Sequence, residues 1–176
     1  MILISINGGT KTQRDLTDDA TRYILGKLLP RTRVLDIDII IKNLLREDLA
    51  GYCLHKDKGE FELGLHNRGH LYNYISYLAH ELIHLKQYNK KELMIKGKLD
   101  VWHGEEMPEL SYAKQPWEIE AWELQSMLAK DFLKNSLGVT YKAAKELSPR
   151  TMKQIDWDYE YKTILDTIAA QERDDG

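Results

Sequence analysis

Residues 80–84 read His-Glu-Leu-Ile-His, a pattern whose side chains can both hold a metal ion and move a proton. In a helix, two histidines four positions apart project from the same face, so both imidazoles can reach one ion. Glu81 lies beside them as a natural general base for a water molecule that zinc makes more acidic. The same carboxylate can later pass the proton to a leaving amine. The motif therefore predicts Zn²⁺-dependent hydrolysis.

A catalytic zinc site needs a third protein ligand, and the next strong helical segment offers acidic candidates. This segment begins at Pro116 and carries Glu118, Glu120 and Glu123 near its start. Acidic residues are also common at helix N-termini because they interact favourably with the helix dipole. At about 100° per residue, Glu118 falls nearer the apolar side of the helix than Glu120 does, which favours Glu118 as the ligand.

Two helices must position these residues. The first runs from about residue 71 to 88, where apolar side chains recur at steps of three and four: Leu71, Ile75, Leu78, Leu82 and Leu85. The two histidines fall opposite this stripe, where a cleft can lie. The second helix runs from Pro116, a residue favoured in the first helical turn, to about Phe132.

The remaining segments predict a small sheet and further helices. Residues 1–9 and 34–45 have the composition of strands, and residues 51–55 and 60–67 flank a turn and predict a hairpin. A helix is expected over 17–29, with Thr17 as its N-cap and Pro30 as its stop. A short hairpin or irregular crossing is expected over 93–103, and a last helical region from Ser148.

Composition places the chain among ordinary globular proteins. Of its 176 residues, 43% are hydrophobic and 30% charged, which predicts one α+β domain over 1–176 with a catalytic core over about 33–133. The net charge of −3 argues against general electrostatic binding of nucleic acid. No segment has the length and composition of a membrane span or signal peptide, and the lone Cys53 suits a reducing compartment. A cytoplasmic location is expected.

The motif occurs together with Trp102-His103-Gly104 and with Tyr112 followed by Pro-Trp-Glu-Ile-Glu-Ala from residue 116. Over about residues 60–130 this combination resembles the small gluzincin-type metallopeptidases common in phage genomes, which are distantly similar to SprT-like proteins. The resemblance implies a minigluzincin-like fold, a small mixed sheet packed on the motif helix and the helix after it. It also implies a host-cytoplasmic peptidase if the chain is phage-encoded.

The same resemblance implies roles for particular residues. The metal ligands would be His80, His84 and a glutamate of the following helix, and the strand before the motif helix, here Glu60–Asn67, would border the cleft. A peptide substrate would bind extended along an edge strand of the sheet. Tyr112 could donate a hydrogen bond to the oxyanion.

The sequence departs from this family at position 122. Many gluzincins carry an acid or asparagine four residues after the ligand glutamate, where it supports a zinc histidine, and Trp122 stands there in this chain. A missing support would weaken metal binding. SprT-like proteins use a third histidine as ligand instead, which makes His103 an alternative to Glu118.

Two other functions remain open from the sequence. Gly51-Tyr52-Cys53-Leu54 is faintly similar to the cysteine segment of peptide deformylases, in which Cys53 would be the third ligand of an amide hydrolase. The chain could also be a catalytically silent zincin fold that serves as an interaction module, although the intact Glu81 favours an enzyme. His66 and His70, which precede the motif helix, could line the cleft.

Overall fold

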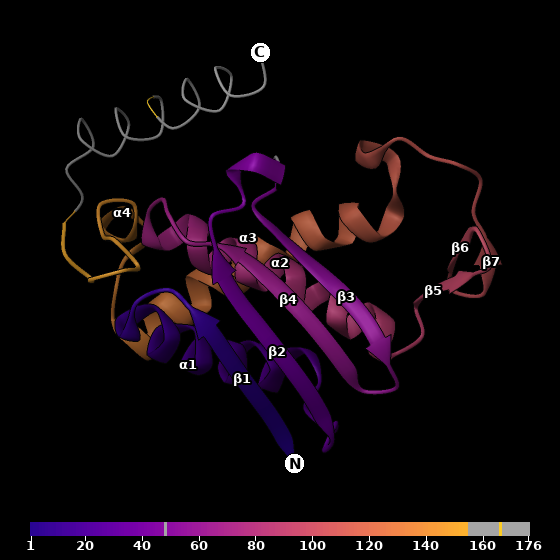
Figure 1. The fold of residues 1–176 in the computed structure, drawn as a ribbon, viewed down its shortest axis with the longest axis horizontal. Helices are drawn as coiled ribbons and strands as arrows, with labels where there is room; N and C mark the ends of the chain where they lie inside the picture. Colours follow the sequence, from indigo (N-terminus) through magenta and orange to yellow (C-terminus); the bar gives the residue numbers. More distant parts are fainter. Residues whose placement is uncertain (48, 155–165, 167–176) are drawn as a thin grey trace.

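A four-stranded mixed sheet forms one side of the protein in the computed structural model, which describes residues 1–47, 49–154 and 166. Its strands are β1 (Ile2–Gly8), β2 (Leu35–Lys42), β3 (Gly51–Asp57) and β4 (Glu60–His66), in the order β1-β2-β4-β3. β2 is parallel to both β1 and β4, whereas β3 and β4 form an antiparallel hairpin. Helices cover one face of the sheet, as expected for the α+β class (Figure 1).

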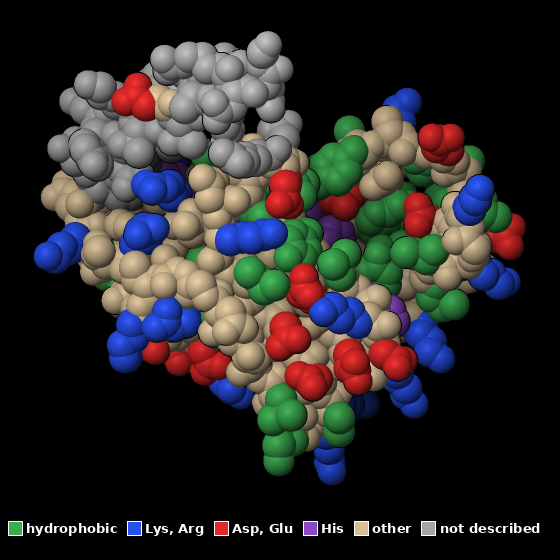
Figure 2. Space-filling model, in the orientation of Figure 1, with side chains coloured by type: hydrophobic (Ala, Val, Ile, Leu, Met, Phe, Trp, Pro, Cys, Tyr) green, Lys and Arg blue, Asp and Glu red, His purple; other side chains and the backbone are tan. Residues whose placement is uncertain are grey.

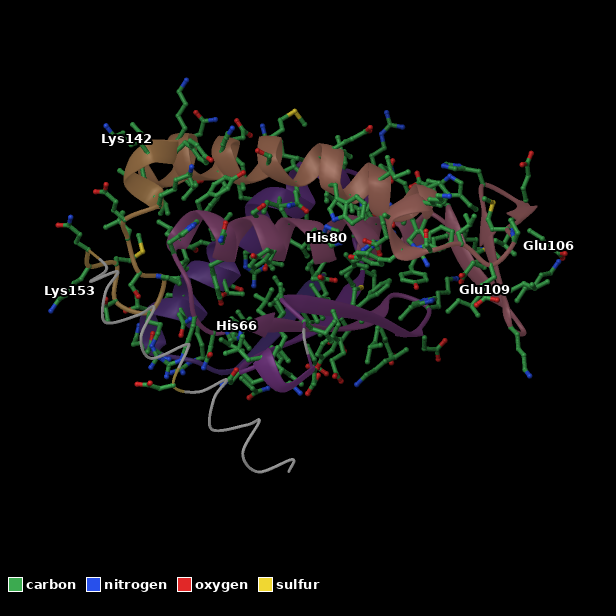
Figure 3. All side chains as sticks on the ribbon, turned by 90° about the horizontal axis from the view of Figure 1, so that it is seen from above. His66, His80, Glu106, Glu109, Lys142 and Lys153 are labelled. Carbon is green, nitrogen blue, oxygen red and sulfur yellow. The ribbon has the colours of Figure 1, made fainter. Side chains whose placement is uncertain are left out.

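The helices form two further layers. α1 (Lys11–Leu28) and α2 (Leu71–Asn89) pack on the sheet, and α3 (Pro116–Leu137) lies across α2 on the side away from the sheet (Figure 3). All five residues of the expected apolar stripe of α2 are buried. Because α3 covers the opposite side of α2, the histidines of the motif are buried as well. α3 extends five residues beyond Phe132 to Leu137 and is capped by Gly138, which adopts a left-handed conformation with φ of 63°.

The strand that borders the cleft is not the one expected from the sequence. We expected Glu60–Asn67 to border the cleft, but β4 lies inside the sheet, paired with β2 on one side and β3 on the other. The sheet has two edge strands, β1 on one side and the first strand of the hairpin, Gly51–Asp57, on the other. The reason is topological, because β4 pairs directly with β2 and leaves only the far side of the hairpin unpaired.

The start of α1 also differs from the expectation. Thr17 was expected as its N-cap, but the helix begins six residues earlier and is capped by Thr10. The side chain of Thr10 accepts a hydrogen bond from the Gln13 backbone, and the Gln13 side chain accepts one from the Thr10 backbone. This reciprocal pair satisfies two amides that the helix leaves free. Thr17 is instead buried inside the helix, where its hydroxyl bonds to the Gln13 carbonyl and to Tyr74.

A second, three-stranded antiparallel sheet lies beyond the edge of the main sheet (Figure 1). It confirms the hairpin expected over 93–103 and consists of β5 (Leu93–Lys96), β6 (Leu99–Trp102) and β7 (Glu105–Glu106). The shorter elements are η1 (Leu45–Glu47), η2 (Tyr112–Lys114) and α4 (Tyr141–Ala144). At the start of the helical region expected from Ser148, residues 148–154 form turns and bends that end in a bridge to Leu147, and of the rest of that segment only residue 166 is described, as helical. Among the described helices none is long and apolar enough to cross a membrane.

Replacing the N-cap, Thr10→Ala, should lower the free energy of unfolding by about 1 kcal/mol, because the Gln13 amide loses its acceptor. Urea denaturation followed by circular dichroism measures the change. Thr12→Ala is the matched control, since Thr12 lies within the helix and caps nothing, and it should cost little. Equal losses in the two variants would contradict the role of Thr10.

Candidate metal centre

Three ligand atoms converge between α2 and α3. His80 Nε2 lies 3.0 Å from His84 Nε2 and 3.0 Å from Glu118 Oε2, and His84 Nε2 lies 3.2 Å from Glu118 Oε1. Ligands held about 2.0–2.1 Å from a tetrahedral ion are separated by about 3.3 Å, so these spacings fit a single small cation. Within the described part of the chain, these three buried residues form a group whose ligand atoms are close enough together to hold a metal ion.

The backbone explains why these side chains meet. His80 and His84 are one helical turn apart on the side of α2 that faces α3, and Glu118 lies in the first turn of α3. Pro116 occupies the start of α3, where its missing amide costs no hydrogen bond. Ala121 is fully buried, and its small side chain lets the two helices approach closely beside Glu118.

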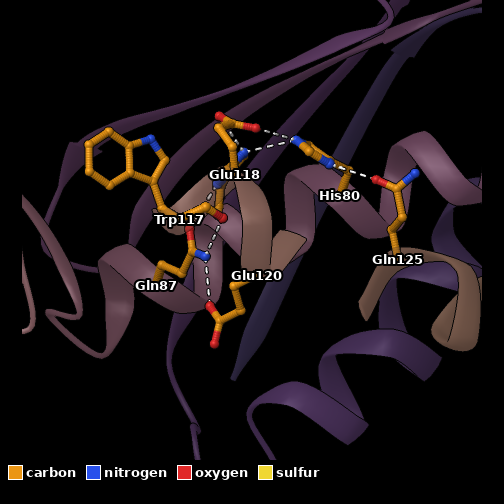
Figure 4. Close-up of polar contacts among 7 residues, drawn as sticks. His80, Gln87, Trp117, Glu118, Glu120 and Gln125 are labelled. Atoms are coloured by element: carbon orange, nitrogen blue, oxygen red, sulfur yellow. Dashed lines mark hydrogen bonds and ion pairs between the residues drawn. The ribbon is translucent and has the colours of Figure 1, made fainter. Parts of the chain in front are cut away.

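Two glutamines hold the outer nitrogens of the histidines (Figure 4). Gln125 Oε1 lies 2.7 Å from His80 Nδ1, and Gln87 Oε1 lies 2.8 Å from His84 Nδ1. The Gln87 amide nitrogen donates to the Trp117 carbonyl at 2.9 Å and to Glu120 at 2.7 Å, which fixes its orientation. His84 therefore carries a proton on Nδ1, and its Nε2 faces the centre.

The site gathers two imidazole nitrogens and a carboxylate around one point. His84 Nε2 faces His80 Nε2 and the Glu118 carboxylate, and in the metal-free protein a proton on a ring nitrogen is donated to Glu118. Two neutral imidazoles with one carboxylate form the His2Glu donor set of catalytic zinc sites. The residues present therefore fit a divalent cation.

The sequence analysis did not identify Gln87 and Gln125. Their spacing carries a signal, since Gln87 is three residues after His84 and Gln125 is seven residues after Glu118, on the same helix faces. Gln125, which contacts His80, lies about one turn beyond Trp122 along α3. The neutral amide of Gln125 forms a hydrogen bond with the His80 imidazole without adding negative charge.

Glu81 is buried beside the ligands, with 6% of its surface exposed. Burial raises the pKa of its carboxyl to about 8, and the negative charge of Glu118 adds to the shift while His80 opposes it. Gly51 of the edge strand packs directly against this side chain: a Cβ atom there would lie 2.8 Å from Glu81 Oε1 and 2.9 Å from the Gly64 carbonyl oxygen. A glycine is needed at this position for the edge strand to approach the carboxyl.

Glu118 has the opposite electrostatic behaviour. Burial alone would raise its pKa, but hydrogen bonds with His80 and His84 lower the pKa of Glu118 to about 2. The carboxylate is therefore ionised throughout the physiological range. Two neighbouring acids in one site thus differ widely in proton affinity, an arrangement typical of functional sites.

Tyr112 lies at the mouth of the site, in η2, and is 57% exposed. Desolvation of its phenol and a hydrogen bond to Glu118 both raise its pKa, so the hydroxyl stays protonated. Together with His80, Glu81, His84 and Glu118, it lines a cavity of about 210 Å³. In Figure 2 this region is a hollow in the surface in which histidine and acidic side chains lie among hydrophobic ones.

The other residues singled out in the sequence lie outside the ligand trio. Glu120 bonds to Gln87 and Lys86, and Cys53 forms part of the cavity wall. His103 follows β6, where its ring packs edge-on against that of Trp102. Neither His66 nor His70 lines this cavity: His66 accepts the Leu44 amide proton, and His70 is the N-cap of α2.

The chain matches no protein-family model, no curated protein and no solved structure. The assignment of function therefore depends on the geometry of this site and on the chemistry of its residues.

The two glutamates of α3 should differ in their effect on metal binding. Glu118→Ala should weaken zinc binding by at least about 100-fold because it removes a ligand, whereas Glu120→Ala should weaken it about 10-fold through the loosened Gln87. Competition with a chromogenic chelator measures both affinities, and the exposed Glu123→Ala serves as the control. Loss of zinc from Glu120→Ala alone would contradict the assignment of Glu118.

In the metal-free protein, the free energy of unfolding should fall as the pH rises from about 4.5 to 8. Across this range the folded state retains a proton on Glu81 that the unfolded state has released, so each rise in pH favours unfolding. The stabilising shift of Glu118 is lost only as the pH falls below about 4.5, outside this window.

Glu81→Gln removes the titrating group, so the wild type should lose on the order of 2 to 4 kcal/mol more than this variant between pH 5 and pH 9. Urea unfolding in the presence of a chelator measures the difference. Parallel stability curves for the two proteins would show that Glu81 has an ordinary pKa.

Proposed function

We propose that this protein is a zinc-dependent peptidase that uses Glu81 as its general base. The observation that carries the proposal is the convergence of His80, His84 and Glu118 on one point with a buried carboxyl beside them. A bound zinc ion supplies Lewis acidity, which makes a water molecule more acidic and polarises a carbonyl group. The imidazole and carboxylate donors suit zinc better than calcium or magnesium, which prefer oxygen ligands.

The residues of the chain divide the work of hydrolysis. Glu81 takes a proton from water while the water oxygen bonds to the carbonyl carbon of the substrate. It then gives this proton to the amide nitrogen as the carbon–nitrogen bond breaks, leaving a carboxylic acid and an amine. A positive charge at the ligand trio would favour the ionised form of Glu81 that this step requires, by reversing the effect of Glu118.

The Tyr112 hydroxyl lies on the open side of the site and remains a hydrogen-bond donor. We assign it to the carbonyl oxygen, on which negative charge develops when water attacks. Gln87 holds His84 with its proton on Nδ1, and Gln125 orients the ring of His80 through its outer nitrogen. This division of roles is that of the gluzincin-type peptidases that the sequence resembles.

The position of the edge strand supports a peptide as substrate. β3 leaves its outer backbone groups unpaired within the described residues, and Gly51, Tyr52 and Cys53 of this strand line the same cavity as the metal ligands. An extended peptide can pair with such an edge through backbone hydrogen bonds. The carbonyl groups of that peptide would then pass beside Glu81.

A catalytically silent interaction module is the competing function. It would use the same fold and bind the same metal without requiring a proton acceptor. Glu81 favours the enzyme, because a carboxyl that is buried at the cost of a raised pKa, against a glycine that makes room for it, has no evident structural purpose.

Glu81→Gln should reduce peptide hydrolysis by about 10³-fold or more while it retains zinc, because the amide preserves the shape of the side chain and cannot accept the proton. Cleavage of a fluorogenic peptide library, read by mass spectrometry, measures activity, and metal analysis measures zinc content. Glu123→Gln is the control. Turnover that survives in Glu81→Gln would exclude Glu81 as the base, and a zinc-loaded wild type that cleaves no peptide would favour the interaction module.

A further inference from the structure

A second cavity, of about 430 Å³, opens directly beside His80 and Glu81. Four of its nine lining residues have large apolar or aromatic side chains: Leu49, Tyr77, Tyr112 and Trp122. Three of them are unusually open to solvent for their type, with exposures of 43% for Leu49, 57% for Tyr112 and 39% for Trp122. Figure 2 shows hydrophobic side chains gathered around the hollow in which histidine is visible. Grouped apolar exposure of this kind marks a binding surface.

The aromatic wall is held in place by the helix that carries the metal ligand. Glu118, Trp122 and Gln125 are separated by four and three residues and so share one face of α3. Trp122 thus lies between the ligand glutamate and the glutamine that supports His80. Tyr112 packs edge-on against its indole ring, with centroids 5.3 Å apart. The wall therefore has a defined position relative to the reacting groups.

The charges around this cavity limit what it can take. Among the described residues that line it, His80 and Glu81 alone have ionisable groups other than phenols, and the proposed reaction uses both. A substrate carboxylate or ammonium group would lose its hydration there without a free counter-charge, which is costly. A bulky apolar side chain would bury its surface against the aromatic rings at no such cost.

The other end of the cleft is different in character. A cavity of about 610 Å³ lies between the β3–β4 turn and β5, and it shares Tyr88 and Leu93 with the metal cavity. It touches none of the ligands and includes Lys56, Lys58 and Lys91. Of the two cavities that flank the metal cavity, the one lined by Leu49, Tyr77, Tyr112 and Trp122 reaches His80 and Glu81, so it is the one placed to select the residue next to the scissile bond.

We propose that Trp122, Tyr112 and Tyr77 form a specificity pocket for a bulky apolar side chain, aromatic or leucine-like, on the residue adjoining the scissile bond of a peptide. This inference rests on the proposed peptidase function. Burying such a side chain contributes about 1.5–3 kcal/mol, which corresponds to roughly 10- to 100-fold in affinity. Position 122 thus serves substrate selection in this chain, while Gln125 takes over the support of the histidine.

Binding to a zinc-loaded Glu81→Gln protein tests the pocket separately from hydrolysis. The probes are capped hexapeptides that are identical except at the two central residues, each of which is varied in turn among Phe, Leu, Ala, Asp and Lys. Isothermal titration calorimetry should show that Phe or Leu at one central position binds at least about 10-fold more tightly than Ala, Asp or Lys. Equal binding of all probes, or no binding of any probe, would overturn the proposal.

Variants of the wall identify the pocket. In the Glu81→Gln background, Trp122→Ala should abolish the apolar preference while zinc content stays the same, and Trp122→Phe should retain most of it. Ile95→Ala, in the lysine-containing cavity, is the matched control and should leave the preference unchanged. A preference that survives Trp122→Ala would place the pocket elsewhere.

The proposed function fails separately, when the wild type cleaves none of these peptides even though the Glu81→Gln protein binds them selectively. Cleavage by the wild type without any apolar preference would sustain the peptidase and refute the pocket.

Discussion

The packing of α3 across α2 is the contact on which the site depends. α2 is buried from both sides, by the sheet below and by α3 above, so its two histidines lie in an environment almost without solvent (Figure 3). In such a place the charge of the Glu118 carboxylate needs a compensating partner, which a bound cation or a proton on an imidazole supplies. The close approach of the helices thus produces a donor set that can hold a cation. The small Ala121 and the early start of α3 at Pro116 make that approach possible.

The supports of the histidines tie the metal centre to the rest of the fold. Gln87 joins three groups, because it accepts from His84 and donates to both the Trp117 carbonyl and Glu120. Glu120 is in turn held by Lys86, so the N-terminus of α3 is tied to α2 on both sides of the ligand. Neutral amides orient the imidazoles without the added negative charge of a carboxylate. The two glutamines therefore raise the basicity of the histidines little. The electrostatics of the centre are dominated by the carboxyl groups of Glu118 and Glu81.

The edge strand contributes by proximity more than by its side chains. Gly51 lets the backbone of β3 come within contact distance of the Glu81 carboxyl, and the same approach desolvates that carboxyl and raises its pKa. The unpaired edge of β3, the proposed base Glu81 and the ligand trio thus line the same cavity. α3 and η2 close the opposite side with Trp122 and Tyr112. The cleft is bounded by backbone on one wall and by aromatic rings on the other.

The sequence by itself determined those features that depend on local spacing. The histidine pair, Glu81 beside it, the two long helices and the β3–β4 hairpin all follow from periodicity and turn chemistry within a few residues. The preference for Glu118 over Glu120 also followed from the angular position of each residue on one helix, and the structure places Glu118 next to the histidines. The start of α1 was mistaken because two threonines can each cap a helix, and only the partner Gln13 distinguishes them.

Only the tertiary structure decided which strand forms the edge and which residues support the histidines. The position of β4 depends on its pairing with β2, a contact between distant segments that no local pattern encodes. Gln125 meets His80 because α3 crosses α2 at a particular register, and the pattern within either helix leaves that register open. The raised pKa of Glu81 arises from burial by Gly51 and its neighbours, so it exists only once the sheet and both helices have packed together.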